Sequence, residues 1–376
     1  MADISLTNNT IYAQNINNFT GELFKVGGQR TPLLAAAGGL NGGKTLNSTF
    51  WQVQVEDNAT ISSEPGKGKE GDAPTEYLGR DRAAYTYVTQ IFHKGVQMTY
   101  TALASTGNQN PFALSANIAN QSDGDGTTTA ANELGLFGGN PVTDEFALQL
   151  EKAMEKVARE VEWFAFNGSF SDGANTTPGD GTREMYGLDV WITLNKNASN
   201  SAAVNPLGGN CYYNDASGDG TGSAQVISFA TISGALKRMY DNHAPMKQPV
   251  LCVSPQQLLD LNNELVKGTV DIAGAIIPRD RNVAGVDIDT IVTPFGSIGL
   301  MVIDPDIMPT GSAFILDLAY IQPVFTNIPG FGTVFVRDLD QDANARIGKA
   351  IYMEMGFEFG PPSYHCKIQA VALSYN

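Results

Sequence analysis

One long amphipathic helix, expected between residues 143 and 166, constrains the fold of this chain more than any other segment. Asn167 and Gly168 form a typical helix end, and Thr143 is a candidate N-cap. Apolar residues recur at the spacing of one helix face: Phe146, Leu150, Ala153, Met154, Val157, Val161, Phe164 and Ala165. The opposite face carries charges: Lys152, Glu155, Lys156, Arg159, Glu160 and Glu162. We therefore expect a rod of about 36 Å with one buried face and one solvated face.

Two alternating segments on the N-terminal side predict a long hairpin. Residues 50–56 place Trp51, Val53 and Val55 on one face, and residues 85–92 alternate in the same way. The polar segment between them has a tip of mixed charge at residues 64–72. An isolated two-stranded hairpin is barely stable in water. We expect it to lie on its own chain or on another subunit.

The C-terminal half alternates helices with strands, which makes the fold class α+β. Helices are predicted at 229–242 and from Ser254, where Ser254 to Gln257 form a capping box with Pro255 at the first helical position. Strands are predicted at 185–192, 248–253, 288–292, 298–303 and 313–318, with a last pair at 347–359 and 366–373.

Composition narrows the function classes. Only 16% of the 376 residues are charged, and the formal net charge is −16. The acidic balance argues against tight nucleic-acid binding by the whole surface, and the low charge content suits a surface buried against partners. The three cysteines are far apart, which favours a reducing compartment. The sequence has no membrane span and no secretory signal at its start, so we expect no membrane partner.

Residues 38–45 match the phosphate-loop pattern, with Lys44 and Thr45 at its end. That motif needs a preceding strand and a following helix. Here an Ala-rich helical segment precedes it and a strand follows. A glycine-rich turn is the preferred interpretation, and a nucleotide-hydrolysing enzyme using these residues is a minor alternative.

Other chemistry is not indicated. The three histidines, His93, His243 and His365, have no partners at a metal-ligand spacing. The acidic run 338–342 lacks the glycine of a calcium loop. We therefore expect no catalytic residues, no cofactor and no metal. The tryptophans Trp51, Trp163 and Trp191 are expected to be core or interface anchors.

The order of these parts resembles the major capsid protein of tailed bacteriophages with the Hong Kong 97 fold. The resemblance covers nearly the whole chain and depends on the order and spacing of short matches. The matches are Thr31–Leu34, Ala158–Trp163, the presumed strand Gly187–Ile192, Val253–Pro255, Phe295–Ile298, Met308–Pro309, Phe314–Asp317 and Glu354.

The resemblance implies a domain plan of five segments. Residues 1–47 would be an N-terminal arm, and 48–92 an extended E-loop hairpin that lies over a neighbouring subunit. Residues 93–225 would form a peripheral domain with the spine helix 143–166 and loop insertions. Residues 226–333 would form the axial domain, and 334–376 the return strands of the peripheral domain.

The resemblance also implies partners. The chain would assemble into pentamers and hexamers of an icosahedral phage head around double-stranded DNA that it contacts weakly. Portal and separate scaffold or decoration proteins would join it, with assembly in the host cytoplasm. Inter-subunit contacts are predicted at Glu64, Lys67, Lys69, Glu70, Asp72, Arg80, Lys152 and Arg159. The Lys–Asn crosslink of some relatives is not carried over. An encapsulin-like cargo shell is the alternative.

Overall fold

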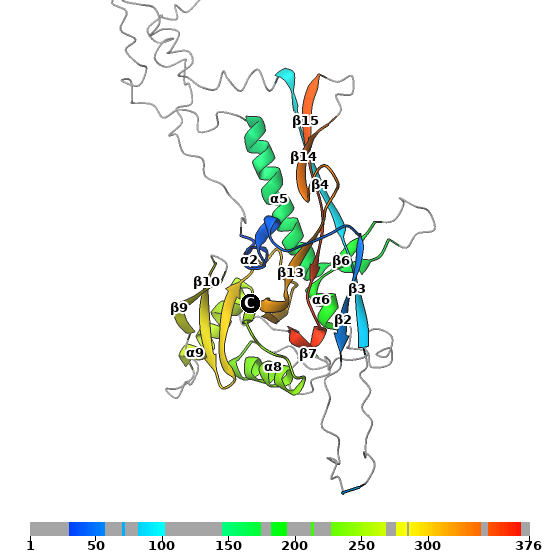
Figure 1. The fold of residues 1–376 in the computed structure, drawn as a ribbon. Helices are drawn as coiled ribbons and strands as arrows, with labels where there is room; N and C mark the ends of the chain where they lie inside the picture. Colours follow the sequence, from blue (N-terminus) through cyan, green and yellow to red (C-terminus); the bar gives the residue numbers. More distant parts are fainter. Residues whose placement is uncertain are drawn as a thin grey trace, which may run out of the picture. The chain divides into compact units, whose positions relative to one another are not determined.

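The computed structural model describes ten ranges of the chain, which divide into two compact units. The described residues are 30–56, 70–71, 82–101, 145–173, 182–193, 212–213, 227–267, 276–283, 286–339 and 345–369. Unit 1 comprises residues 1–28, 94–156 and 336–351, and unit 2 comprises 29–93, 157–335 and 352–376. The helix α5 (Glu145–Asn167) is one uninterrupted element (Figure 1). It confirms the predicted long helix, whose first two residues lie outside the described ranges.

In unit 1, strand pairing brings distant parts of the chain together. The strands β4 (Gln90–Thr99) and β14 (Val334–Asp338) both pair with β15 (Arg346–Glu358). The Leu339 N–H donates to the Gly348 carbonyl over 2.9 Å. A β-carbon at Gly348 would lie 3.0 Å from Gln97 and 3.1 Å from Leu339. This unit therefore packs its strands closely around Gly348.

Unit 2 contains a seven-stranded sheet with the order β7-β16-β12-β8-β11-β10-β9. The central strands β8 and β12 are antiparallel to each other, and every residue of both is buried. Such two-sided burial is typical of the middle of a covered sheet. In chain order the members are β7 (Tyr212–Tyr213), β8 (Pro249–Val253), β9 (Ile276–Val283), β10 (Val286–Thr293), β11 (Gly296–Val302), β12 (Ser312–Asp317) and β16 (Cys366–Gln369).

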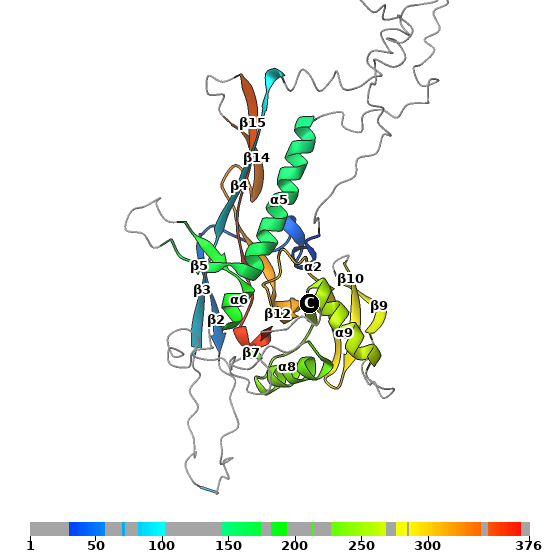
Figure 2. The same cartoon turned by 180° about the vertical axis from the view of Figure 1, so that it is seen from behind.

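Two capped helices lie next to each other against this sheet (Figure 2). In α8 (Phe229–Asp241), the Ser228 hydroxyl accepts a hydrogen bond from the Thr231 N–H at 3.0 Å. In α9 (Pro255–Lys267), the Ser254 N–H donates to the Gln257 side chain at 2.9 Å, and the Gln257 N–H donates back at 3.4 Å. The predicted capping box is therefore confirmed, and it satisfies helix N–H groups that lack intrahelical partners.

The remaining elements of unit 2 are short. The strand β1 (Lys44–Leu46) runs parallel to β13 (Gln322–Thr326), which is antiparallel to β15. Two hairpins complete the unit: β2 (Phe50–Glu56) with β3 (Arg82–Val88), and β5 (Ser169–Ser171) with β6 (Glu184–Tyr186). The helical pieces are α2 (Pro32–Ala36), η1 (Gly39–Asn41), α6 (Leu188–Thr193), η6 (Leu318–Tyr320) and η7 (Pro362–Tyr364).

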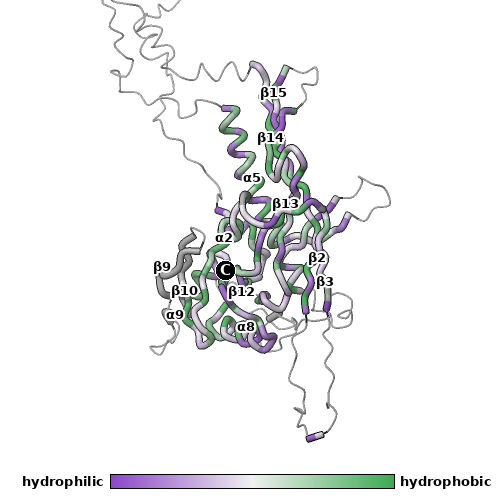
Figure 3. Tube along the Cα trace, viewed as in Figure 1, coloured by the Kyte–Doolittle hydropathy of each residue, from purple (hydrophilic) through white to green (hydrophobic). Residues whose placement is uncertain are grey.

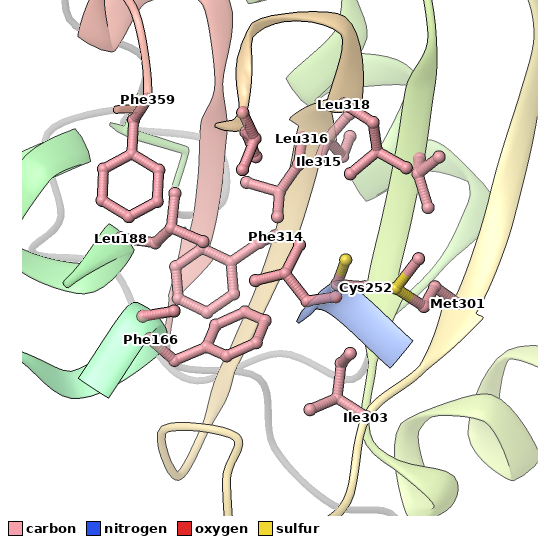
Figure 4. Packing of buried hydrophobic residues seen from close by; sticks show 14 of the residues in the cluster. Phe166, Leu188, Cys252, Met301, Ile303, Phe314, Ile315, Leu316, Leu318 and Phe359 are labelled. Carbon is pink, nitrogen blue, oxygen red and sulfur yellow. The ribbon is translucent and has the colours of Figure 1, made fainter. Parts of the chain in front are cut away.

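The apolar stripe of α5 enters the core of unit 2. Val157, Val161, Ala165 and Phe166 are fully buried. The Phe166 ring lies 5.6 Å from the Phe314 ring of β12, with Leu188 beside them (Figure 4). Figure 3 shows the matching alternation of hydrophobic and hydrophilic residues along α5. Burial of such aromatic side chains is a large stabilising term in any core.

Three sequence predictions were wrong in detail. The predicted strand 185–192 is β6 followed by α6, because a short buried apolar run does not distinguish a strand from a helix. The predicted strand 85–92 is divided at Thr89, where β3 ends and the chain passes to another sheet. The last two strands do not form a hairpin, because β15 belongs to the β13 sheet and β16 pairs with β12. The proposed domain borders remain a prediction.

Val157→Pro tests the continuity of α5. The substitution removes a helix hydrogen bond and places a ring against the preceding turn, so we expect unfolding to become easier by about 3 kcal/mol or more. Urea denaturation followed by circular dichroism measures the loss. The control Lys152→Ala, at an exposed position of the same helix, should change stability by less than about 0.5 kcal/mol. Equal stability of both variants would contradict the assignment.

Candidate assembly site

The base of the β2–β3 hairpin is built by regular antiparallel pairing. The register runs from Phe50 opposite Val88 to Glu56 opposite Arg82. On the outer face, the Gln52 amide donates to the Thr86 hydroxyl over 3.2 Å. On the inner face, Tyr85 and Tyr87 are buried. The predicted hairpin is therefore confirmed at its base, whereas residues 57–69 and 72–81 lie outside the described ranges.

An aromatic cluster fixes this base to the same chain. Trp51 stacks on Tyr87 with a centroid distance of 5.3 Å, and Tyr87 lies 4.7 Å from Trp191. The Tyr87 hydroxyl and the Trp191 indole N–H both donate to the Gly360 carbonyl, over 3.3 and 3.1 Å. Two of the three tryptophans are thus packed in this cluster, while Trp163 is 40% exposed on α5. The hairpin was expected to lie on its own chain or on another subunit. At its base, it packs on its own chain.

Gly356 of β15 lets the hairpin approach closely. A β-carbon at this position would lie 2.8 Å from the Trp51 ring and 2.8 Å from the Val88 carbonyl. Real β-carbons do not make such contacts, so a larger residue would push β2 and β3 away from β15. The absence of a side chain at Gly356 is therefore a packing requirement of the hairpin base.

A polar network holds the junction where β3 ends. The Thr89 N–H donates to the Thr49 carbonyl at 2.9 Å, and its hydroxyl lies 3.3 Å from that of Thr326. Arg183 donates to Thr89 at 3.4 Å and pairs with Glu354 at 3.5 Å. Both charged side chains are largely buried, so each depends on the other for stabilisation. Glu354, one of the residues on which the resemblance to capsid proteins depends, therefore has Arg183 of the same chain as its partner.

Glu162 on α5 contacts the short helix α2. Its side chain is fully buried, and its two oxygens accept the N–H groups of Leu33 and Leu34 at 3.4 and 3.3 Å. These N–H groups belong to the first turn of α2, where no intrahelical acceptor exists. Burial raises the pKa of Glu162 to about 8, against the lowering effect of the two N–H groups. The expectation that Glu162 lies on a solvated face was wrong, because the end of α5 is covered by α2.

Arg159, one turn before Glu162, is half-buried and paired within the chain. Its guanidinium lies 3.2 Å from Asp304 and 3.8 Å from Asp306. Its Nε is buried without a hydrogen-bond partner among the described residues. Asn167 adds a second tie to the same region by donating to the Ile307 carbonyl at 2.7 Å. The end of α5 is therefore fastened to the turn that precedes β12.

Only some of the residues predicted to contact other subunits lie within the described ranges. Glu64, Lys67, Lys69, Asp72 and Arg80 lie outside the described ranges. Glu70 is exposed in a turn, and Lys152 is exposed on α5 in unit 1. Arg159 belongs to unit 2. Their role in contacts between subunits remains a prediction.

The glycine-rich loop 38–45 does not have the geometry of a phosphate loop. The helix α2 precedes it and the strand β1 follows, which reverses the required order. Lys44 donates to Glu358 at 2.8 Å instead of pointing at an open anion site. Gly43 has a φ of 105°, and a β-carbon there would overlap the Pro323 carbonyl. The glycine serves the close approach of this loop to β13.

His365 is a buried structural histidine that the sequence did not identify. Its Nδ1 accepts the Asp317 N–H at 3.2 Å, and its Nε2–H donates to the Phe359 carbonyl at 2.5 Å. Burial lowers the pKa of its imidazole to about 4. The Asp317 carboxylate accepts the N–H groups of Lys247 and Gln248 at 2.8 and 2.9 Å. A neutral imidazole therefore ties the end of β12 to the segment after β15.

The described residues contain no cluster of three or more histidine, cysteine or acidic side chains that could bind a metal ion. Among these same residues, no helix is long and apolar enough to cross a membrane.

Solved structures similar to this chain are phage capsid proteins and their relatives with the Hong Kong 97 fold. The capsid subunit of cyanophage A-1(L) is 12% identical, with a TM-score of 0.59 over 97% of this chain and 99% of that chain. The capsid of a native GTA particle is 14% identical, with a TM-score of 0.53 over 97% and 99%. An encapsulin from Synechococcus elongatus PCC 7942 is 12% identical, with a TM-score of 0.50 over 94% of each chain. At these identities the likeness defines the fold.

A comparison of the amino-acid sequence with protein families identifies the family of this chain. The family described as SU10 major capsid protein matches residues 5–372. The chain belongs to this family and is a major capsid protein, a structural component of a phage virion. A search of curated proteins gave no match.

Gly356→Ala tests the packing of the hairpin base. The added methyl group meets the Trp51 ring and the Val88 carbonyl, so we expect a loss of about 1–3 kcal/mol in unfolding free energy. Trp51 should become more accessible to a fluorescence quencher. Gly95→Ala is the matched control, because a β-carbon there has only one neighbour, at 3.7 Å. Equal effects of both substitutions would show that Gly356 has no special packing role.

His365 predicts a stability loss in acid. Because its pKa is lowered to about 4 in the folded chain, the unfolded chain binds a proton first as the pH falls below 6.5. Relative to His365→Gln, the wild type should lose up to about 3 kcal/mol between pH 6.5 and 4. Urea denaturation at several pH values measures the difference. Parallel curves for the two proteins would exclude a neutral buried imidazole.

Proposed function

We propose that this capsid protein assembles into pentamers and hexamers that close into an icosahedral head. The proposal rests on membership of the SU10 major capsid family together with a hairpin whose base is rigidly held on its own chain. A fixed base with a long polar extension suits a segment that reaches beyond its own subunit. In this proposal residues 48–92 lie over a neighbour, and residues 226–333 meet around the symmetry axes. No enzymatic step is assigned to the chain.

The head would enclose double-stranded DNA and be assembled in the host cytoplasm. The net charge of −16 favours weak contact with packaged DNA, since strong binding to phosphates needs lysine and arginine. Portal, scaffold or decoration proteins would complete the particle. An encapsulin-like cargo shell is less favoured, since the encapsulin likeness extends to the fold alone.

Electron microscopy of the purified protein tests the proposal. We expect closed particles with fivefold and sixfold clusters of subunits, formed by the chain alone or with a co-expressed scaffold. A protein that stays monomeric under all conditions, with and without phage partners, would overturn it. Cargo enzymes inside DNA-free shells would instead support the encapsulin alternative.

Deletion of residues 64–72 should prevent assembly while the subunit still folds. The reason is that the hairpin base is held by Trp51, Tyr87 and Trp191, none of which is removed. Size-exclusion chromatography with light scattering measures assembly, and circular dichroism verifies the fold. A Gly/Ser replacement of equal length keeps the reach but removes the charges, and should weaken assembly less. A deletion variant that assembles like the wild type would contradict a contact role for this tip.

A further inference from the structure

The turn between β13 and β14 carries the most exposed large apolar side chain in the described part of the protein. This side chain is Phe331, which is 63% exposed, and the turn spans residues 327–333. Its sequence, Asn-Ile-Pro-Gly-Phe-Gly-Thr, contains no charged residue. A single exposed apolar side chain is common on any protein surface and needs no explanation by itself. The fixed backbone of this turn and the aromatic rings next to Phe331 distinguish it from such cases.

Backbone hydrogen bonds fix the position of Phe331. The Ile328 N–H donates to the Gly332 carbonyl, over 3.0 Å. The N–H groups of Phe331 and Gly332 both donate to the Ile328 carbonyl, also over 3.0 Å. Gly330 and Gly332 have φ values of 85° and 94°, and a β-carbon on either would meet no other atom within 4 Å. These two glycines therefore serve the backbone conformation of the turn and not close packing.

A row of three aromatic rings connects Phe331 to strand β15. The Phe331 ring lies 5.0 Å from the Phe335 ring, which lies 5.3 Å from the Tyr352 ring. The Tyr352 hydroxyl donates to Glu354 over 2.7 Å, and Glu354 pairs with Arg183. All five residues belong to unit 2. Phe331 is thus held on a supported row, so fixing its ring in a contact costs little conformational entropy.

The chemistry of the turn favours a protein partner, and the number of turns favours this chain itself. The turn has no lysine or arginine, so it lacks the groups that bind nucleic-acid phosphates. An aromatic side chain held at the surface is typical of the anchor residues that supply most of the energy of a protein interface. Each copy of a major capsid protein carries the turn, so a partner of equal number is needed. Other copies of the chain meet that need in any shell that it forms.

We propose that Phe331 is an anchor of the contact between two copies of this chain, with its ring inserted into an apolar hollow of the second copy. The ring is exposed in the free subunit and buried in the shell. The turn holds it in place before the copies meet. This inference rests on the proposed function and names one contact of the shell.

Substitution of Phe331 tests the energetic part of the proposal. Phe331→Ser removes a surface ring, so the subunit should keep its fold by circular dichroism. The protein concentration needed for particle formation should rise by at least about 10-fold, since one aromatic anchor is lost. Phe331→Met keeps an apolar side chain and should have a smaller effect. Light scattering over a concentration series measures both, and assembly of Phe331→Ser at the wild-type concentration would overturn the proposal.

A photo-crosslinker in place of Phe331 identifies what the side chain contacts. Chains with benzoylphenylalanine at this position are mixed with an excess of wild-type chains, assembled, irradiated and separated under denaturing conditions. Two covalently joined copies, formed in particles and not in unassembled subunits, are the expected product. Crosslinks confined to one chain, or made only to a scaffold or decoration protein, would overturn the proposal. Recovery of uncrosslinked chains alone from assembled particles would overturn it as well.

The two experiments separate this contact from the proposed function. If wild-type chains form closed particles and Phe331 contacts no second copy, the contact is excluded and shell formation stands. If wild-type chains form no particles under any condition, shell formation and the contact are both excluded. If Phe331→Ser fails to fold, crosslinking in the mixed particles decides the outcome.

Discussion

The burial of the second half of α5 is the constraint on which the rest of unit 2 depends. Phe166 lies against Phe314 at the centre of the seven-stranded sheet, and Val157 and Val161 continue the same buried stripe. The polar side of this half is not free either, because Arg159 and Asn167 are tied to the turn before β12. A helix fixed on both sides can act as a rigid reference for the segments packed on it. Displacing this half of α5 would expose the Phe166 ring and would also break the ion pair between Arg159 and Asp304.

The hairpin base shows how a weak element is stabilised by a strong one. Two strands alone would be barely stable, but Trp51 and Tyr87 stack into a cluster whose other members come from β6 and α6. The Gly360 carbonyl accepts the Tyr87 hydroxyl and the Trp191 indole N–H, whereas the Trp51 indole N–H is buried without a hydrogen-bond partner among the described residues. The base of the hairpin is therefore held by the core of its own chain.

Sequence reasoning identified the elements with strong periodic signals and missed features that depend on tertiary contacts. The helix α5 and the capping box at Ser254 were predictable, since each follows from local spacing. The helix α6 was not, because its buried apolar residues also fit a strand. Glu162 was placed on a solvated face because nothing in the local sequence reveals that α2 covers it. The charge-bearing tip at 64–72 was proposed from composition, and its contact with other subunits remains a prediction.

Glu162 and His365 have opposite pKa shifts, so their contributions to the pH dependence of stability offset each other in mildly acidic solution. Between pH 4.5 and 6.5 the unfolded chain carries an ionised Glu162 and a protonated His365, whereas the folded chain holds both groups neutral. Folding then takes up one proton at Glu162 and releases one at His365, so their contributions to the pH slope cancel. Above pH 6.5 only the Glu162 contribution of this pair remains, and it declines as the pH rises to about 8. Below pH 4.5 only the His365 contribution of this pair remains, and it declines toward pH 4. The combined contribution of these two groups to stability is therefore flat between pH 4.5 and 6.5 and declines on either side.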